Sequence, residues 1–149
     1  MLTESPAKAS KSPVKDEAYV VSLCDEVLGL VGSRQHRFDF LRGDSRSGRR
    51  AVTLAVDVYY PELSLVIEYQ GRQHTEAVRF FDKPDRITAS GVHRGEQRKI
   101  YDQRRRDVLP KHGIRLVEIS FQDLSCDSRG RLLGHREKDI EVIRRALAR

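Results

Sequence analysis

Apolar residues recur at every third or fourth position near the start of the chain, which is the spacing of one buried helical face. A helix is therefore expected to begin near Asp16 and to end between Gly29 and Gly32, since glycine commonly ends helices. The positions expected to face the core are Val20, Leu23, Val27, Leu30 and Val31.

Two further helices are expected later in the chain. A highly charged segment over residues 95–112 precedes Gly113 and predicts one of them. Residues 136–148 repeat the helical spacing and predict a closing helix. Its inward positions are expected to be Ile140, Ile143, Ala146 and Leu147.

Four strands are expected between these helices. Apolar and polar residues alternate over residues 35–41, 51–60 and 63–70, and the last two segments predict a hairpin around Pro61. Residues 114–120, with the sequence IRLVEIS, predict the fourth strand. The resulting order, α-β-β-β-α-β-α, indicates the α/β class.

The remaining segments predict a tail, a turn and a loop. Residues 1–15 are rich in Pro, Ser, Ala and Lys and predict a disordered basic tail or linker, which leaves residues 16–149 as a single domain. Residues 42–50 predict a basic turn, and residues 72–95 predict an irregular polar segment.

Composition and charge narrow the range of functions. The 149 residues include 28 Lys and Arg and 22 Asp and Glu, a net charge of +6 that favours nucleic acid as the partner. No apolar run reaches the roughly 18 residues of a membrane span, so no membrane partner is expected. Cys24 and Cys126 have no zinc-site spacing and suit a reducing compartment, which predicts a cytoplasmic, nucleoid-associated protein.

Acidic residues on the predicted hairpin are the sharpest candidates for chemistry. If the turn lies between Pro61 and Ser64, Asp57 stands opposite Glu68, with Cβ atoms roughly 5 Å apart. Two carboxylates at such a short distance repel each other, and a bound Mg²⁺ or Mn²⁺ relieves the repulsion. Gln70 follows on the same face and could orient a water or a phosphate. The alternative is an ordinary hairpin whose acids face solvent or pair with arginines.

A string of short motifs runs through residues 17–119. Its members are Asp57, Pro61-Glu62, Ile67-Glu68, Gly71, Gln73-His74, Phe80-Phe81, Asp102 and Gly113-Ile114. Their order and spacing resemble the PD-(D/E)xK restriction-endonuclease-like superfamily, and within it the branch near very-short-patch repair and phage or homing-type endonucleases. The resemblance implies an αβββαβ core with a mixed central sheet flanked by helices, followed here by a C-terminal helix.

The resemblance also implies a role for each matching residue. Asp57 would be the central metal ligand, and Glu68, the second acid of the signature, would complete a site for Mg²⁺ or Mn²⁺. Gln70 stands where the signature has lysine, which departs from the family's pattern. His74 matches a catalytic histidine after the third strand, and Glu17 best matches an acid of the first helix.

A catalytic acid of the later helix matches Asp102, and Arg105 would stabilise phosphate charge. The alternative to a catalytic role is that Asp102 and Arg105 form an ion pair on a solvated helix face. For Glu17, the alternative is an acid in the first turn that the helix dipole favours. His74 is then a surface histidine, and Asp107 competes with Asp102. The residues expected to contact DNA are Arg72, Arg98, Lys99, Arg104, Arg105 and Arg106.

Together these inferences predict a metal-dependent endonuclease that hydrolyses DNA in repair, restriction or the processing of mobile elements or phage. The ion would polarise a phosphoryl oxygen and activate water, with His74 as a general base or acid. The alternative, favoured by Gln70, is a catalytically weak or inactive nucleic-acid-binding module of the same fold. A homodimer or a larger DNA-processing complex is compatible with the short chain.

Overall fold

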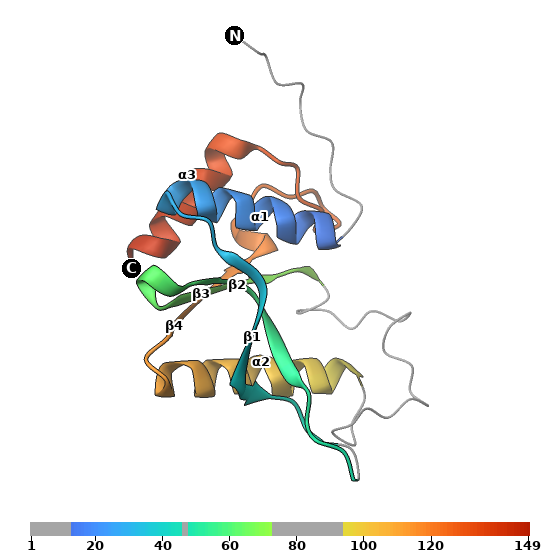
Figure 1. Cartoon of the computed structure of the whole chain (residues 1–149). Helices are drawn as coiled ribbons and strands as arrows, with labels where there is room; N and C mark the ends of the chain where they lie inside the picture. Colours follow the sequence, from blue (N-terminus) through green and yellow to red (C-terminus); the bar gives the residue numbers. More distant parts are fainter. Residues whose placement is uncertain (1–12, 46–47, 73–93) are drawn as a thin grey trace.

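The computed structural model describes residues 13–45, 48–72 and 94–149 of the chain (Figure 1). Within them the predicted order of helices and strands is confirmed, and the protein belongs to the α/β class. The elements are α1 (Pro13–Leu28), β1 (Ser33–Arg42), β2 (Thr53–Tyr60), η1 (Pro61–Leu63), β3 (Leu65–Gln70), α2 (Arg94–Lys111), β4 (Arg115–Ser120), η3 (Phe121–Asp123) and α3 (Arg136–Ala148).

The first helix begins earlier than the sequence predicted, at Pro13 rather than near Asp16. Proline suits the first turn of a helix, where its missing N–H has no intrahelical partner to lose. The predicted boundary of the tail at residue 15 is therefore wrong, and residues 1–12 lie outside the described part of the chain. None of the described helices is long and apolar enough to cross a membrane.

The four strands form one mixed sheet in the order β1-β2-β3-β4. The pairs β1–β2 and β2–β3 are antiparallel, whereas β3 and β4 run parallel. A parallel pair needs a crossover connection, and α2 lies between β3 and β4 along the chain. In Figure 1, α1 and α3 lie on one face of the sheet and α2 lies on the other.

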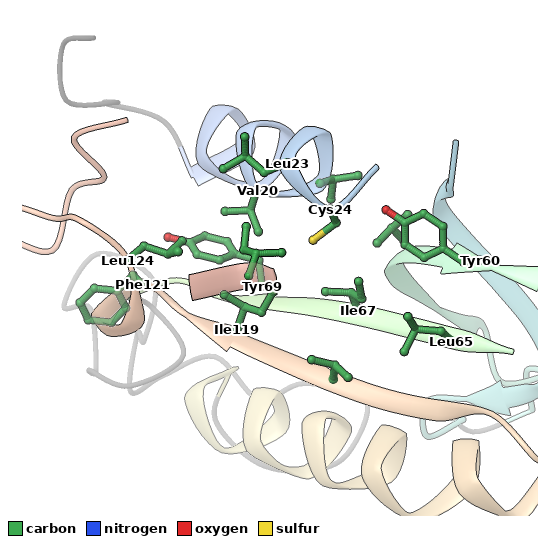
Figure 2. Close-up of a cluster of buried hydrophobic side chains, with 14 of the residues drawn as sticks. Val20, Leu23, Cys24, Tyr60, Leu65, Ile67, Tyr69, Ile119, Phe121 and Leu124 are labelled. Atoms are coloured by element: carbon green, nitrogen blue, oxygen red, sulfur yellow. The ribbon is translucent and has the colours of Figure 1, made fainter. Parts of the chain in front are cut away.

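The larger core lies between the sheet and helices α1 and α3 (Figure 2). Leu23 of α1, Ile67 of β3 and Ile143 of α3 are almost completely buried in it. One predicted core position is wrong, because Val31 is 86% exposed. Gly29 has a φ of +67° and ends α1, so the chain leaves the helical face before Val31. The other predicted inward positions of α3, which are Ile140, Ala146 and Leu147, pack against this core.

A smaller core forms on the α2 face and reveals a twist in β2. Val56 belongs to this core, together with Val66 of β3 and Leu109 of α2. Val58 belongs instead to the larger core, although residues two apart in a flat strand point to the same face. Strand β2 therefore twists sharply between Val56 and Val58, which is the position of Asp57.

Candidate active site

The β2–β3 ladder ends next to Asp57, and beyond that point two side-chain carboxylates accept hydrogen bonds from backbone N–H groups. The ladder pairs Tyr60 with Leu65 and ends with Val58 opposite Ile67, a register that sets Asp57 opposite Glu68, as expected from the hairpin. The N–H of Asp57 donates to Glu68 Oε2 at 2.8 Å, and the N–H of Tyr69 donates to Asp57 Oδ2 at 2.7 Å. Each acid thus satisfies a backbone donor of the neighbouring strand.

A third carboxyl group reaches this point from the first turns of α1. Glu17 is in hydrogen-bond contact with the side chain of Asp57. Gln35 of β1 also holds Glu17, because its Nε2 donates to Glu17 Oε2 at 2.7 Å. We call Glu17, Asp57 and Glu68 the acidic cluster. The structure therefore brings together three of the predicted site residues, which come from α1, β2 and β3.

Arg105 of α2 compensates the most buried member of the acidic cluster. Glu68 is only 7% exposed, and its Oε1 lies 3.0 Å from Nε of Arg105. The same guanidinium pairs with Asp102 at 3.2 Å and donates to the carbonyl oxygen of Ala55 at 3.0 Å. Asp102 is thus connected to the cluster through Arg105, and the predicted ion pair between these two residues is confirmed, although it is largely buried.

Burial and mutual repulsion raise the pKa values of the acidic cluster. Burial, followed by the neighbouring charge of Glu68, raises the pKa of Asp57 to about 7. Burial and the contact with Asp57 raise the pKa of Glu17 to about 7. Burial also raises the pKa of Glu68, against the opposing effect of the Arg105 charge. At neutral pH the cluster therefore retains protons that ordinary carboxyl groups have lost.

Gln70 does not complete the acidic cluster through any described contact. Its Nε2 donates instead to Glu118 Oε2 at 3.3 Å, across the parallel pair of β3 and β4. Arg106 binds the same carboxylate of Glu118 at 2.6 and 2.9 Å. Gln70 and Glu118 therefore form a second polar network beside the cluster. His74 lies outside the described residues.

The basic residues of α2 are largely engaged within the protein. Arg104 pairs with Asp44 at 2.8 Å and lies over the ring of Tyr101, while Arg105 is only 17% exposed. Arg98 is half-buried and Lys99 is exposed. Asp107, the predicted competitor of Asp102, is exposed and accepts a hydrogen bond from Gln103.

The basic loop formed by residues 127–131 was missed as a candidate surface. Exposed Arg72, which follows β3, donates to the carbonyl oxygen of Arg129 at 3.1 Å. Asp127 fixes the loop by accepting the N–H groups of Arg129 and Arg131 at 2.8 and 3.0 Å. The sequence does place two arginines around Gly130 in a loop, but only the fold brings them next to Arg72.

Gln35 was missed as well, and here the sequence carries no signal. Its φ is +49°, in the left-handed region that glycine and asparagine favour and glutamine does not. Such a conformation costs a non-glycine residue on the order of 1 kcal/mol. A glutamine within an alternating stretch of a predicted strand gives no warning of it.

The acidic cluster matches a hard divalent cation in the type of its donors, since carboxylate oxygens suit Mg²⁺ or Mn²⁺. Asp57 and Glu68 remain the expected ligands, and Glu17 is in hydrogen-bond contact with Asp57. Among residues 13–45, 48–72 and 94–149, no group of three or more His, Cys, Asp or Glu side chains is placed to hold a metal ion.

Comparison with known proteins finds one viral relative of a part of the chain. A segment of 68 residues, 46% of this chain, is 38% identical to a protein of frog virus 3 (isolate Goorha) named uncharacterized protein 094L. The match spans 40% of that viral protein. No family model and no solved structure matches the chain.

Replacing Arg105 with leucine should destabilise the fold by about 3 kcal/mol, because buried Glu68 then lacks its counter-charge. Urea unfolding measures the loss. Arg106→Leu is the matched control, since it removes the neighbouring, half-exposed pair with Glu118 and should cost at most about 1 kcal/mol. Equal losses in the two variants would show that Arg105 does not compensate a buried charge.

The raised pKa values predict that the metal-free protein loses stability between about pH 4 and pH 7. The folded protein holds protons there that the unfolded chain releases, so unfolding becomes more favourable as the pH rises. In the presence of chelator, the melting temperature of Asp57→Asn should fall less than that of the wild type as the pH rises from 5 to 8. Glu62→Gln, at an exposed position, should follow the wild type. If the melting temperature of Asp57→Asn changes with pH as it does in the wild type, the raised pKa of Asp57 is contradicted.

Proposed function

We propose that this protein is a divalent-metal-dependent nuclease that hydrolyses DNA phosphodiester bonds on a restriction-endonuclease-like core. The observation that carries the proposal is the acidic cluster at the point where β2 and β3 part. There Glu68 accepts the backbone N–H of Asp57, Asp57 accepts the backbone N–H of Tyr69, and Glu17 is in contact with Asp57. The αβββαβ order and the mixed sheet flanked by helices agree with this core.

The chemistry expected of the site is hydrolysis by an activated water. Mg²⁺ or Mn²⁺, held by Asp57 with Glu68 or Glu17, would supply charge to a phosphoryl oxygen and lower the pKa of a bound water. Arg105 would act by holding Glu68 in place, since its guanidinium is bound to Glu68, Asp102 and Ala55. His74 would serve as a general base or acid, a role implied by the resemblance alone.

DNA would approach from the end of the sheet where β3 leads into Arg72. The basic loop of residues 127–131 lies at this end, joined to Arg72 by the bond to Arg129. Arginine side chains on a loop held by Asp127 suit contacts to a phosphate backbone. The loop therefore adds to the DNA-contacting residues proposed for α2, among which Lys99 is exposed.

A second candidate function is a nucleic-acid-binding module of this fold without efficient catalysis. The arrangement of Gln70 favours it, because the residue in the signature's lysine position donates to Glu118 rather than to the acidic cluster. A glutamine side chain supplies neither positive charge nor a base. Such a module would work within a larger DNA-processing complex, in the cytoplasm and on the nucleoid.

Purified full-length protein should nick or cut DNA when Mg²⁺ or Mn²⁺ is added, and chelator should stop the reaction. Asp57→Asn should lower the cleavage rate about a hundredfold. Its circular dichroism spectrum and melting curve should still be those of a folded protein. Glu141→Gln, an exposed acid of α3, is the control and should cleave as the wild type does. Equal cleavage by Asp57→Asn would overturn the site, and DNA binding without cleavage by the wild type would favour the binding module.

The basic loop should contribute to the salt dependence of DNA binding, measured in chelator so that no cleavage occurs. Each phosphate contact contributes about 0.9 to the slope of log affinity against log salt. Replacing Arg129 and Arg131 with alanine should therefore lower the slope by about 2. The matched control replaces Arg144 and Arg145, two exposed arginines of α3, and should leave the slope unchanged. An unchanged slope in the loop variant would remove the loop from the interface.

A further inference from the structure

Gln35 adopts a strained backbone that neither a turn nor a change of register explains. Its φ of +49° lies in the left-handed region, although it stands inside β1. The pairs on either side, Arg34 with Val58 and His36 with Val56, keep the same register, so no residue is inserted at this point. The chain neither reverses nor gains a residue there; Gln35 stands opposite Asp57, where the side chains of β2 change from the smaller core to the larger one.

The contact that accompanies this conformation is made by the side chain. Gln35 occupies the register position opposite Asp57, and its Nε2 donates to Glu17 Oε2 at 2.7 Å. Glu17 in turn is in hydrogen-bond contact with Asp57. The amide of Gln35 therefore holds the carboxyl group of Glu17 next to Asp57.

Ser64 offers a comparison within the same chain. It is the other described non-glycine residue with a positive φ, +47°, and it follows the short helix η1 in the turn of the β2–β3 hairpin. A left-handed residue is ordinary at the end of a helical turn, where the chain must change direction. Gln35 makes no such turn, and its side chain bonds to Glu17 on another element.

We infer that Gln35 is a positioning residue that holds the carboxyl group of Glu17 against Asp57, so that both carboxyl groups can bind one divalent cation. The use of this arrangement rests on the proposed function, in which Asp57 is a metal ligand. Within that function, Gln35 keeps the α1 acid from swinging into solvent, and its amide donates to one carboxyl oxygen of Glu17. A hydrogen bond to a metal-binding carboxylate orients it toward the ion.

The test separates backbone strain from side-chain positioning in the full-length protein. Gln35→Gly relieves the positive φ and removes the amide, so its free energy of unfolding in urea should stay at or above that of the wild type. Its affinity for Mn²⁺, measured by calorimetry, should fall about tenfold. Gln35→Asn tolerates positive φ but is one methylene too short, so it should behave in the same way.

Ser64→Gly is the matched control, because it relieves the same kind of strain away from the acidic cluster. It should stay as stable as Gln35→Gly and keep the wild-type affinity for Mn²⁺. If Gln35→Gly and Gln35→Asn also keep that affinity, the positioning role is wrong and Gln35 is only a strained strand residue.

A metal-free measurement keeps this inference separable from the proposed function. Replacing Gln35 should shift the NMR resonances of the side-chain carboxyl carbons of Glu17 and Asp57, whereas Ser64→Gly should move neither. Mn²⁺ binding without DNA cleavage by the wild type would overturn the nuclease and leave the affinity comparison in force. If the wild type binds no Mn²⁺, the metal-site role fails, and unmoved carboxyl resonances would overturn the contact as well.

Discussion

The separation of β2 from β3 at Asp57 is the constraint on which the rest of the site depends. Parting strands leave backbone N–H groups without ladder partners, and a buried unpaired donor costs about as much as a lost hydrogen bond. Asp57 and Glu68 satisfy two of these donors with their side chains. This solution places two carboxylates in a largely apolar sheet, and it works because Arg105 pairs with Glu68 and ties the carbonyl of Ala55 to α2.

The acids that hold the strands are also the acids that repel one another. Burial and proximity raise the pKa values of Asp57 and Glu17 to about 7, so these carboxyl groups retain part of their protons near neutral pH, while Arg105 pairs with Glu68. Such an arrangement stores unfavourable electrostatic energy that a bound cation would release. The same residues can therefore serve the fold and the proposed chemistry without contradiction.

Periodicity predicted the order of the elements, although β3 is buried on both faces, and the hairpin register followed from the turn at Pro61. Tertiary contacts escaped prediction. Val31 continues the helical spacing, yet Gly29 ends α1 first and leaves Val31 exposed. Gln35 lies in a strand with a backbone that its residue type disfavours, and its partner Glu17 stands on another element. The exposure of Val31 follows from the end of α1 at Gly29, whereas the contact of Gln35 depends on how α1 lies against the sheet.

The fold most alters the prediction of which basic residues can meet a partner. The three consecutive arginines of α2 look like a phosphate-binding stripe, but the fold gives each one an acidic partner: Asp44 for Arg104, Glu68 with Asp102 for Arg105, and Glu118 for Arg106. Their charge largely neutralises acids of the same chain. Among the described residues, the loop of residues 127–131 places its arginines beside Arg72, and there we propose contact with a phosphate backbone. Basic density in a sequence thus locates charge, whereas ion pairing decides how much of it reaches a partner.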